Sequence, residues 1–154
     1  MTNPEDLGLS DEELKKISAE ILDHSNNPRN YGVMNDPVAI SRATNEFNNE
    51  AVIVYLKTSN DMIDDITFVS NGCKDMVVSA SLFTEMIKGD TVANALDVSS
   101  SMLKQLDQAP DTQKDAASLV LLAFEGCFKY IENKSNGIEE EMYTIVINEG
   151  KGEK

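Results

Sequence analysis

The chain is poor in the residues that form covalent and metal cross-links. Its 154 residues include two cysteines, Cys73 and Cys127, and one histidine, His24. Two cysteines do not make a disulfide framework, and no CxxC or HxxxH pair is present to build a zinc site. These counts exclude a self-contained metal cage made of cysteine and histidine.

Long apolar runs and an excess of basic charge are also missing. No apolar run approaches the roughly 20 residues of a membrane helix. The acidic N-terminus, MTNPEDLGLSDEELKK, lacks the apolar segment of a secretory signal. The net charge of −14 opposes binding to nucleic-acid phosphates and anionic membranes. We therefore expect a cytoplasmic protein with no nucleic-acid or membrane partner, whose surface would attract a basic protein.

Two segments rich in β-branched and aromatic residues predict an antiparallel hairpin. They are Ala51–Thr58 and Met62–Val69, separated by the turn-forming Ser59–Asp61. Met142–Ile147 favours one further strand. Hydrophobic residues make up 41% of the chain, which is enough for a core. We expect an α+β domain in which a small antiparallel sheet, the hairpin plus one or two strands, packs against several helices.

Helical spacing of apolar residues is found on both sides of the hairpin. Ser10 and Glu13 form a capping box at the start of the first predicted helix. That helix carries its apolar positions on one face: Leu14, Ile17, Ile21 and Leu22. After the hairpin we expect a helix from about Met76 to Lys88, two short helices after Thr91, and a long helix over Thr112–Glu132. Residues 1–9 are interpreted as an arm, 10–134 as the domain and 135–154 as an acidic tail.

Two stretches carry a resemblance to a known family. ILDHSNNPRNYG (Ile21–Gly32) resembles a D-H-x-x-x-P-R-N-x-G segment, and NGCKDMVVSASLFTEMIKGDTVANAL (Asn71–Leu96) resembles a strand–cysteine–helix stretch. Both are features of the iron–sulfur cluster assembly scaffold family, of the IscU type and the NifU N-terminal domain. The resemblance covers roughly Ile17 to Asn133. It implies the fold of that family and a role in iron–sulfur cluster assembly.

The resemblance also implies that most metal ligands of the family are replaced. The three cysteine positions fall on Phe47, Cys73 and Ala116, the aspartate on Asn49, and the histidine on Asp115. A [2Fe–2S] cluster needs about four thiolate or imidazole ligands. We therefore expect that the isolated chain holds no conventional cluster stably. The cofactor stays unknown, with transient iron or a transient iron–sulfur cluster at Cys73 as the alternative to none.

Cys73 has two interpretations. It lies where a helix N-terminus favours the thiolate, so it could hold a persulfide or provide one metal bond. Asp75 and Asp115 would then be the further ligands of iron or zinc. Alternatively, Cys73 is a small residue in a strand-to-helix turn, and Asp115 is a capping carboxylate.

The remaining chemistry-bearing residues favour structural roles. Cys127 lies on the apolar face of the last helix and is predicted to be a buried hydrophobe. We expect His24 to brace its loop and Arg29 to pin the loop by bonding backbone carbonyls. No nucleophile–base pair is evident, so we expect no enzyme.

Three functions are compatible with these residues. The first is a member of the cluster-assembly machinery that works with a cysteine desulfurase or with a ligand-complete homologue. The second is a pseudo-scaffold that serves as an adaptor, regulator or structural subunit. The third is a small metal-binding protein that uses Cys73, Asp75 and Asp115. The sequence leaves a homo-oligomer open.

Overall fold

The computed structural model describes residues 10–106 and 111–147. Helices and strands are both present, so the predicted α+β class is confirmed. The elements in chain order are α1 (Asp11–Asn26), β1 (Ala39–Asn45), β2 (Glu50–Ser59), β3 (Met62–Ser70), α2 (Lys74–Ile87), α3 (Val92–Gln105), α4 (Asp111–Ser135) and β4 (Tyr143–Ile147).

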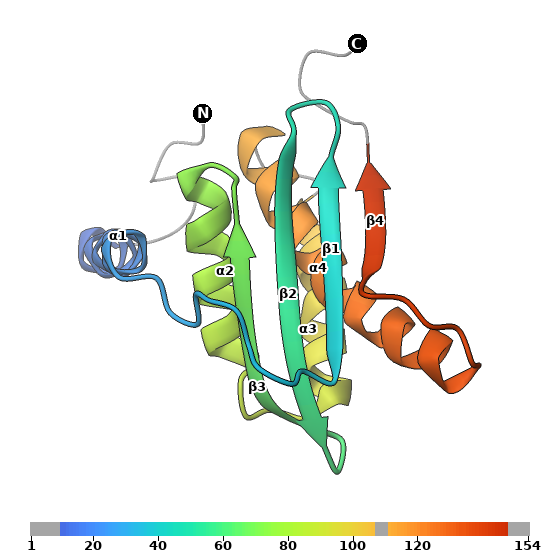
Figure 1. Ribbon diagram of the computed structural model, residues 1–154. Coiled ribbons are helices and arrows are strands. Elements are labelled where there is room, and N and C mark those ends of the chain that lie inside the picture. Colours follow the sequence, from blue (N-terminus) through green and yellow to red (C-terminus); the bar gives the residue numbers. More distant parts are fainter. Residues whose placement is uncertain (1–9, 107–110, 148–154) are drawn as a thin grey trace.

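The strands form one mixed sheet in the order β3-β2-β1-β4 (Figure 1). β1, β2 and β3 are antiparallel neighbours, and β4 runs parallel to β1. The strand predicted over Met142–Ile147 is thus present. It makes the sheet mixed, whereas the sequence predicted an antiparallel one. The connection from β1 to β4 passes through β2, β3 and three helices, which is long enough for the crossover that a parallel pair requires.

The predicted hairpin is confirmed as β2 and β3. Its tip places Asn60 and Asp61 at φ of 52° and 61°. Positive φ at both central residues is the geometry of a two-residue turn whose twist matches that of the strands. Asparagine and aspartate tolerate this left-handed conformation better than other non-glycine residues.

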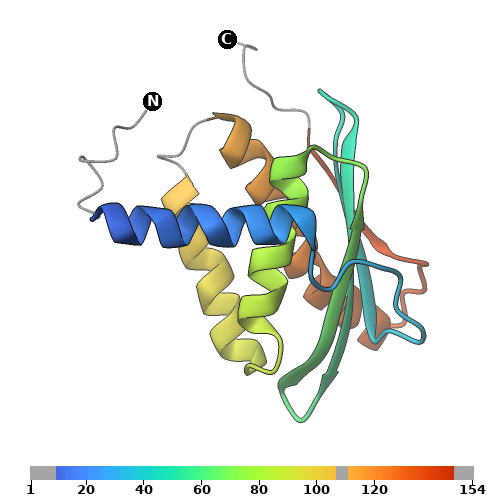
Figure 2. The same cartoon turned by 90° about the vertical axis from the view of Figure 1, so that its left-hand side faces the viewer.

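Helices α2, α3 and α4 cover one face of the sheet (Figure 2). The core between these layers is aromatic at its centre, where the rings of Phe83 and Phe124 meet edge to face with centroids 5.0 Å apart. Phe68 of β3 is fully buried in the same core. Burial of such side chains supplies most of the energy that holds helices on the sheet.

Helix α4 approaches β1 closely because small residues face each other there. Ala39, Ser41 and Ala43 are three of the four inward-facing residues of β1, and all three are fully buried. Gly126 of α4 lies opposite them, and a Cβ at Gly126 would overlap the Ser41 hydroxyl. The side chains of Tyr143 and Ile145 would be only 3.0 Å from such a Cβ, so the same glycine also fits α4 against β4.

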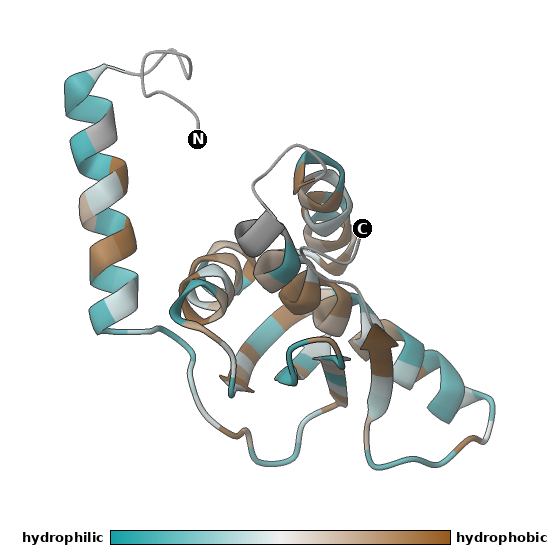
Figure 3. Ribbon diagram, turned by 90° about the horizontal axis from the view of Figure 1, so that it is seen from above, coloured by the Kyte–Doolittle hydropathy of each residue, from teal (hydrophilic) through white to brown (hydrophobic). Residues whose placement is uncertain are grey.

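Helix α1 begins with the predicted Ser10–Glu13 capping box, but three apolar residues of its predicted face are exposed. Ile17, Ile21 and Leu22 are 44%, 45% and 61% exposed. Seen from above, α1 stands to one side of the other helices (Figure 3). Its amphipathic spacing therefore indicates a helix without indicating that the helix packs into the core.

Helix α3 is a single helix, so the prediction of two short helices after Thr91 is wrong. The Thr91 side chain accepts the amide of Asn94, as expected of the residue that begins the helix. None of the helices in the described ranges is long and apolar enough to cross a membrane.

Candidate functional site

Cys73 lies at the turn between β3 and α2, as predicted, and its side chain is exposed. It is the N-cap residue of α2, but its thiol makes no capping hydrogen bond. The backbone amide of Cys73 instead donates to Oε2 of Glu50, at 3.0 Å. A carboxylate at a helix N-terminus interacts favourably with the helix dipole, so Glu50 stabilises the start of α2.

The turn between β1 and β2 lies beside Cys73 and carries two positions that the resemblance assigns to family ligands. Phe47 is 47% exposed, and Asn49 has a φ of 61°. Asn71, just before Cys73, connects this turn to the end of β3. Its Oδ1 accepts the Ala51 amide at 2.7 Å, and its Nδ2 donates to the Asn49 carbonyl at 3.4 Å.

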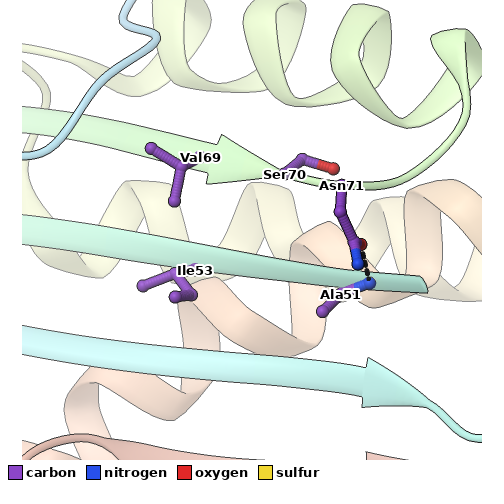
Figure 4. Close-up of a pocket in the computed structure, with 5 residues that line it drawn as sticks. All are labelled: Ala51, Ile53, Val69, Ser70 and Asn71. Atoms are coloured by element: carbon purple, nitrogen blue, oxygen red, sulfur yellow. Dashed lines mark hydrogen bonds between the residues drawn. The ribbon is translucent and has the colours of Figure 1, made fainter. Parts of the chain in front are cut away.

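Two shallow hollows adjoin this end of the sheet. The first, of about 270 Å³, has an apolar floor formed by Ile53 and Val69 on the sheet face opposite the helices (Figure 4). The second, of about 300 Å³, contains Arg42, Glu46 and Glu50 among its lining residues. Neither contains a cysteine or histidine, and neither is an enclosed catalytic pocket.

The predicted oxygen ligands lie on two helices. Asp75 is exposed in the first turn of α2, and Asp115 is half-buried on α4. Ala116 is 1% exposed, so the position that the resemblance assigns to the third cysteine faces the core. Among the residues that the structure describes, no three His, Cys, Asp or Glu side chains form a group that could hold a metal ion. Metal binding by Cys73, Asp75 and Asp115 stays a prediction, and it requires movement of these side chains or ligands from elsewhere.

His24 forms part of a buried polar cluster between α1 and α2, and it is 2% exposed. Its Nδ1 is 2.6 Å from the Ser81 hydroxyl, and its Nε2 is 3.4 Å from Oε1 of Glu85. The Ser81 hydroxyl also accepts the backbone amide of Arg29, at 2.8 Å. This arrangement braces the loop after α1, as predicted for His24.

Arg29 pins the same loop, also as predicted. Its guanidinium donates to the Asn27 carbonyl at 3.0 Å and pairs with Asp23. The hydrogen bond from Arg29 lowers the pKa of the Asp23 carboxyl below its ordinary value. The D-H-x-x-x-P-R-N segment therefore anchors the end of α1 and lies outside the Cys73 region.

Cys127 is fully buried, and its thiol faces the Val54 carbonyl at 3.7 Å. Burial raises the pKa of this thiol far above its ordinary value because the thiolate would lose its hydration. The predicted role of Cys127 as a small core hydrophobe is confirmed.

Comparison with known proteins agrees with the fold and the segments described above. A family model for the NifU-like N terminal domain matches residues 16–136. The chain belongs to this family. In the structure of a nitrogen-fixing NifU-like protein (N-terminal) from Brucella abortus, 93% of the chain superposes on 75% of this one with a TM-score of 0.63. The sequence identity is 20%, so this likeness concerns the fold alone.

Family members with assigned names are similar over different lengths. The iron-sulfur cluster assembly scaffold protein IscU of Aquifex aeolicus is 29% identical over 128 residues, 81% of this chain and 82% of that protein. The zinc-dependent sulfurtransferase SufU of Bacillus subtilis is 35% identical over 79 residues, which span 51% of this chain and about half, 53%, of SufU.

Sequence reasoning missed Glu50 as a neighbour of Cys73. Glu50 begins β2 and Cys73 follows β3, so the hairpin brings together residues that are 23 positions apart. A hairpin register that placed Ala51 beside Asn71 would have identified this proximity. Nothing in the letters NEFNNE distinguishes Glu50 from the other polar residues of that turn.

Proposed function

We propose that this protein acts in or beside the iron–sulfur cluster assembly machinery as a ligand-depleted member of the scaffold family, and that it does not hold a conventional cluster alone. The observation that carries this proposal is the donor set around Cys73. Its one exposed thiol is accompanied by the carboxylate of Glu50, while Phe47 and Ala116 offer no lone pair. Soft cluster iron prefers thiolate to oxygen ligands.

The residues present therefore do not fit a [2Fe–2S] cluster. A thiol at position 116 would start inside the core, because Ala116 is 1% exposed. Phe47 and Asn49, in contrast, lie on an accessible turn beside Cys73, where side chains can be exchanged without disturbing the core. For this reason, metal ligands are best restored at Phe47 and Asn49, in the turn between β1 and β2.

The test is anaerobic reconstitution with iron and sulfide, with the Aquifex aeolicus scaffold protein as the positive reference. The wild-type chain should retain far less than one cluster per chain after desalting. The double variant Phe47→Cys/Asn49→Asp should retain more iron, and the matched variant Phe47→Ser/Asn49→Asp, which lacks the added thiol, should not. A stoichiometric wild-type cluster whose visible absorption is lost in Cys73→Ala would refute the proposal.

The role of adaptor is a second candidate, and one observation favours it. Phe47 exposes an aromatic side chain at a position that the family otherwise gives to a ligand, and exposed aromatics are common anchors of protein interfaces. A cysteine desulfurase is the partner to test first, because the family resemblance implies it. Phe47→Ala should weaken a measured complex, whereas Met86→Ala, which removes another apolar side chain that is 57% exposed, should not. Equal effects of the two variants would count against the adaptor role.

A further inference from the structure

Strand β4 is an addition to the part of the chain that matches the family. The family model ends at residue 136, and β4 covers Tyr143–Ile147 at one end of the strand order. Among the residues that the structure describes, β1 is the only strand that pairs with β4. In Figure 1, the side of β4 away from β1 carries no further strand. The addition has thus moved the edge of the sheet outward.

The open side of β4 presents the backbone groups of two residues. The Ile147 carbonyl accepts the Glu46 amide at 2.8 Å, so the backbone polar groups of Ile147 point towards β1. Successive residues of a strand point these groups to opposite sides. Thr144 and Val146 therefore direct their amides and carbonyls away from β1, towards the open edge.

Nothing in the sequence of β4 protects this edge. YTIVI has no lysine, proline or glycine, although natural edge strands commonly carry lysine, proline or a bulge that prevents pairing with other chains. The side chain of Val146 is 54% exposed, and that of Thr144 is also exposed. An unprotected edge of β-branched residues is suited to the addition of a strand from another chain.

The charge beside β4 indicates what kind of strand would be added. Glu139, Glu140 and Glu141 lie two to four residues before the strand, and the whole chain has a net charge of −14. Pairing of two copies would bring two such chains together, and like charges at paired strands are destabilising. A basic strand would instead be attracted.

The second hollow also favours a basic partner, on the outer face of the sheet. Val146 lines this hollow of about 300 Å³ together with Glu46 and Glu50. Arg42 lines it as well and contributes one positive charge. Glu46 directly follows β1, the neighbour of β4, so outward-facing side chains of a strand added to β4 would approach its carboxylate, whereas Glu50 lies on β2, one strand further away.

We propose that the open edge of β4 binds an extended, basic segment of a partner protein by strand addition. The backbone groups of Thr144 and Val146 pair with the added strand. Lysine or arginine side chains of the partner meet the carboxylates of Glu139, Glu141 and Glu46. This interface requires no cluster and no metal, so it does not depend on the proposed function.

The probe is a synthetic peptide in which lysine alternates with valine and threonine, added to the ¹⁵N-labelled full chain. We expect the Thr144 and Val146 amides to shift and to exchange more slowly with solvent. The same peptide with glutamate in place of lysine should bind more weakly. The charge variant Glu139→Lys/Glu141→Lys, which leaves Glu140 bonded to Asn133, should reduce this preference.

Val146→Pro removes one amide donor of the open edge without removing a bond to β1. Its affinity for the lysine peptide should fall about fivefold, the effect of losing one hydrogen bond. Should Val146→Pro fail to fold, the amide exchange of the wild-type chain and the charge variant decide the matter. Equal binding of the two peptides, or binding that leaves the β4 amides unchanged, would overturn the proposal. A wild-type dimer with protected β4 amides would show instead that a second copy occupies the edge.

Discussion

The close contact between α4 and β1 leads to a quantitative prediction for Gly126→Ala. The added Cβ would overlap the Ser41 hydroxyl and would be 3.0 Å from side-chain atoms of Tyr143 and Ile145. Overpacking of this kind costs about 1–3 kcal/mol. Replacing glycine by alanine inside a helix returns about 1 kcal/mol. We expect a net loss of up to about 2 kcal/mol in the free energy of unfolding.

Ser41 provides the control for this reasoning. Its hydroxyl is buried and has no hydrogen-bond partner within residues 10–106 and 111–147. Ser41→Ala removes an unsatisfied polar group and should by itself stabilise the protein by about 1 kcal/mol. The same change removes the atom that the new Cβ would overlap. Gly126→Ala should therefore cost less in the Ser41→Ala background than in the wild type.

Urea unfolding of the four proteins, followed by far-ultraviolet circular dichroism, gives the coupling between the two sites. A coupling of about 1 kcal/mol in the compensating direction is expected for residues in direct contact. Strictly additive effects would refute the steric argument. So would a Gly126→Ala protein that is more stable than the wild type, because helix propensity alone would then explain the result.

Three further outcomes are expected. In native protein, a thiol reagent should label Cys73 long before Cys127, and faster labelling of Cys127 would contradict its burial. Cys127→Ser should lower the unfolding free energy by roughly 1–3 kcal/mol because a hydroxyl is buried in apolar surroundings. The folded-state pKa of Asp23 is lowered, so its pairing with Arg29 stabilises the fold above the unfolded pKa of roughly 3.9 and is lost as the pH falls through the folded value. Asp23→Asn should therefore flatten the decline of unfolding free energy below about pH 4 in a series of urea titrations, and an unchanged slope would contradict the pairing. Ser81→Ala leaves the buried His24 Nδ1 and the part-buried Arg29 amide without their bond to the Ser81 hydroxyl and should cost about 1–3 kcal/mol in the same urea assay, whereas a neutral effect would show that the cluster does not brace the loop.

The sequence predicted the hairpin and α2 because their apolar residues have clear periodicity and clear turn signals. It missed β1 for a physical reason. The inward positions of β1 are Ala39, Ser41, Ala43 and Asn45, none of them a large apolar residue, and Ser41 is small because Gly126 of α4 lies close above it. Such a strand shows little hydrophobic alternation, although it lies at the centre of the fold.

The candidate site could be predicted only in part. The position of Cys73 at the start of a helix follows from the local sequence. Its contact with Glu50 depends on the hairpin register and therefore on tertiary structure. For α1, the spacing of apolar residues predicts the helix correctly but does not predict whether its apolar face is buried. Ile17, Ile21 and Leu22 are exposed because too few neighbouring residues cover them.

The hydrogen bond from the Cys73 amide to the Glu50 carboxylate affects which small ions can bind at the start of α2. The first amides of a helix commonly bind anions, because their donors are unpaired and the helix dipole is positive there. In this protein Glu50, 3.0 Å from the Cys73 nitrogen, already supplies that anion. Hydrosulfide, phosphate or sulfate would meet an occupied donor and a negative charge, while an ammonium or guanidinium group would meet a carboxylate fixed in place. The Glu50 carboxylate therefore disfavours anions at the Cys73 amide, beside the exposed thiol.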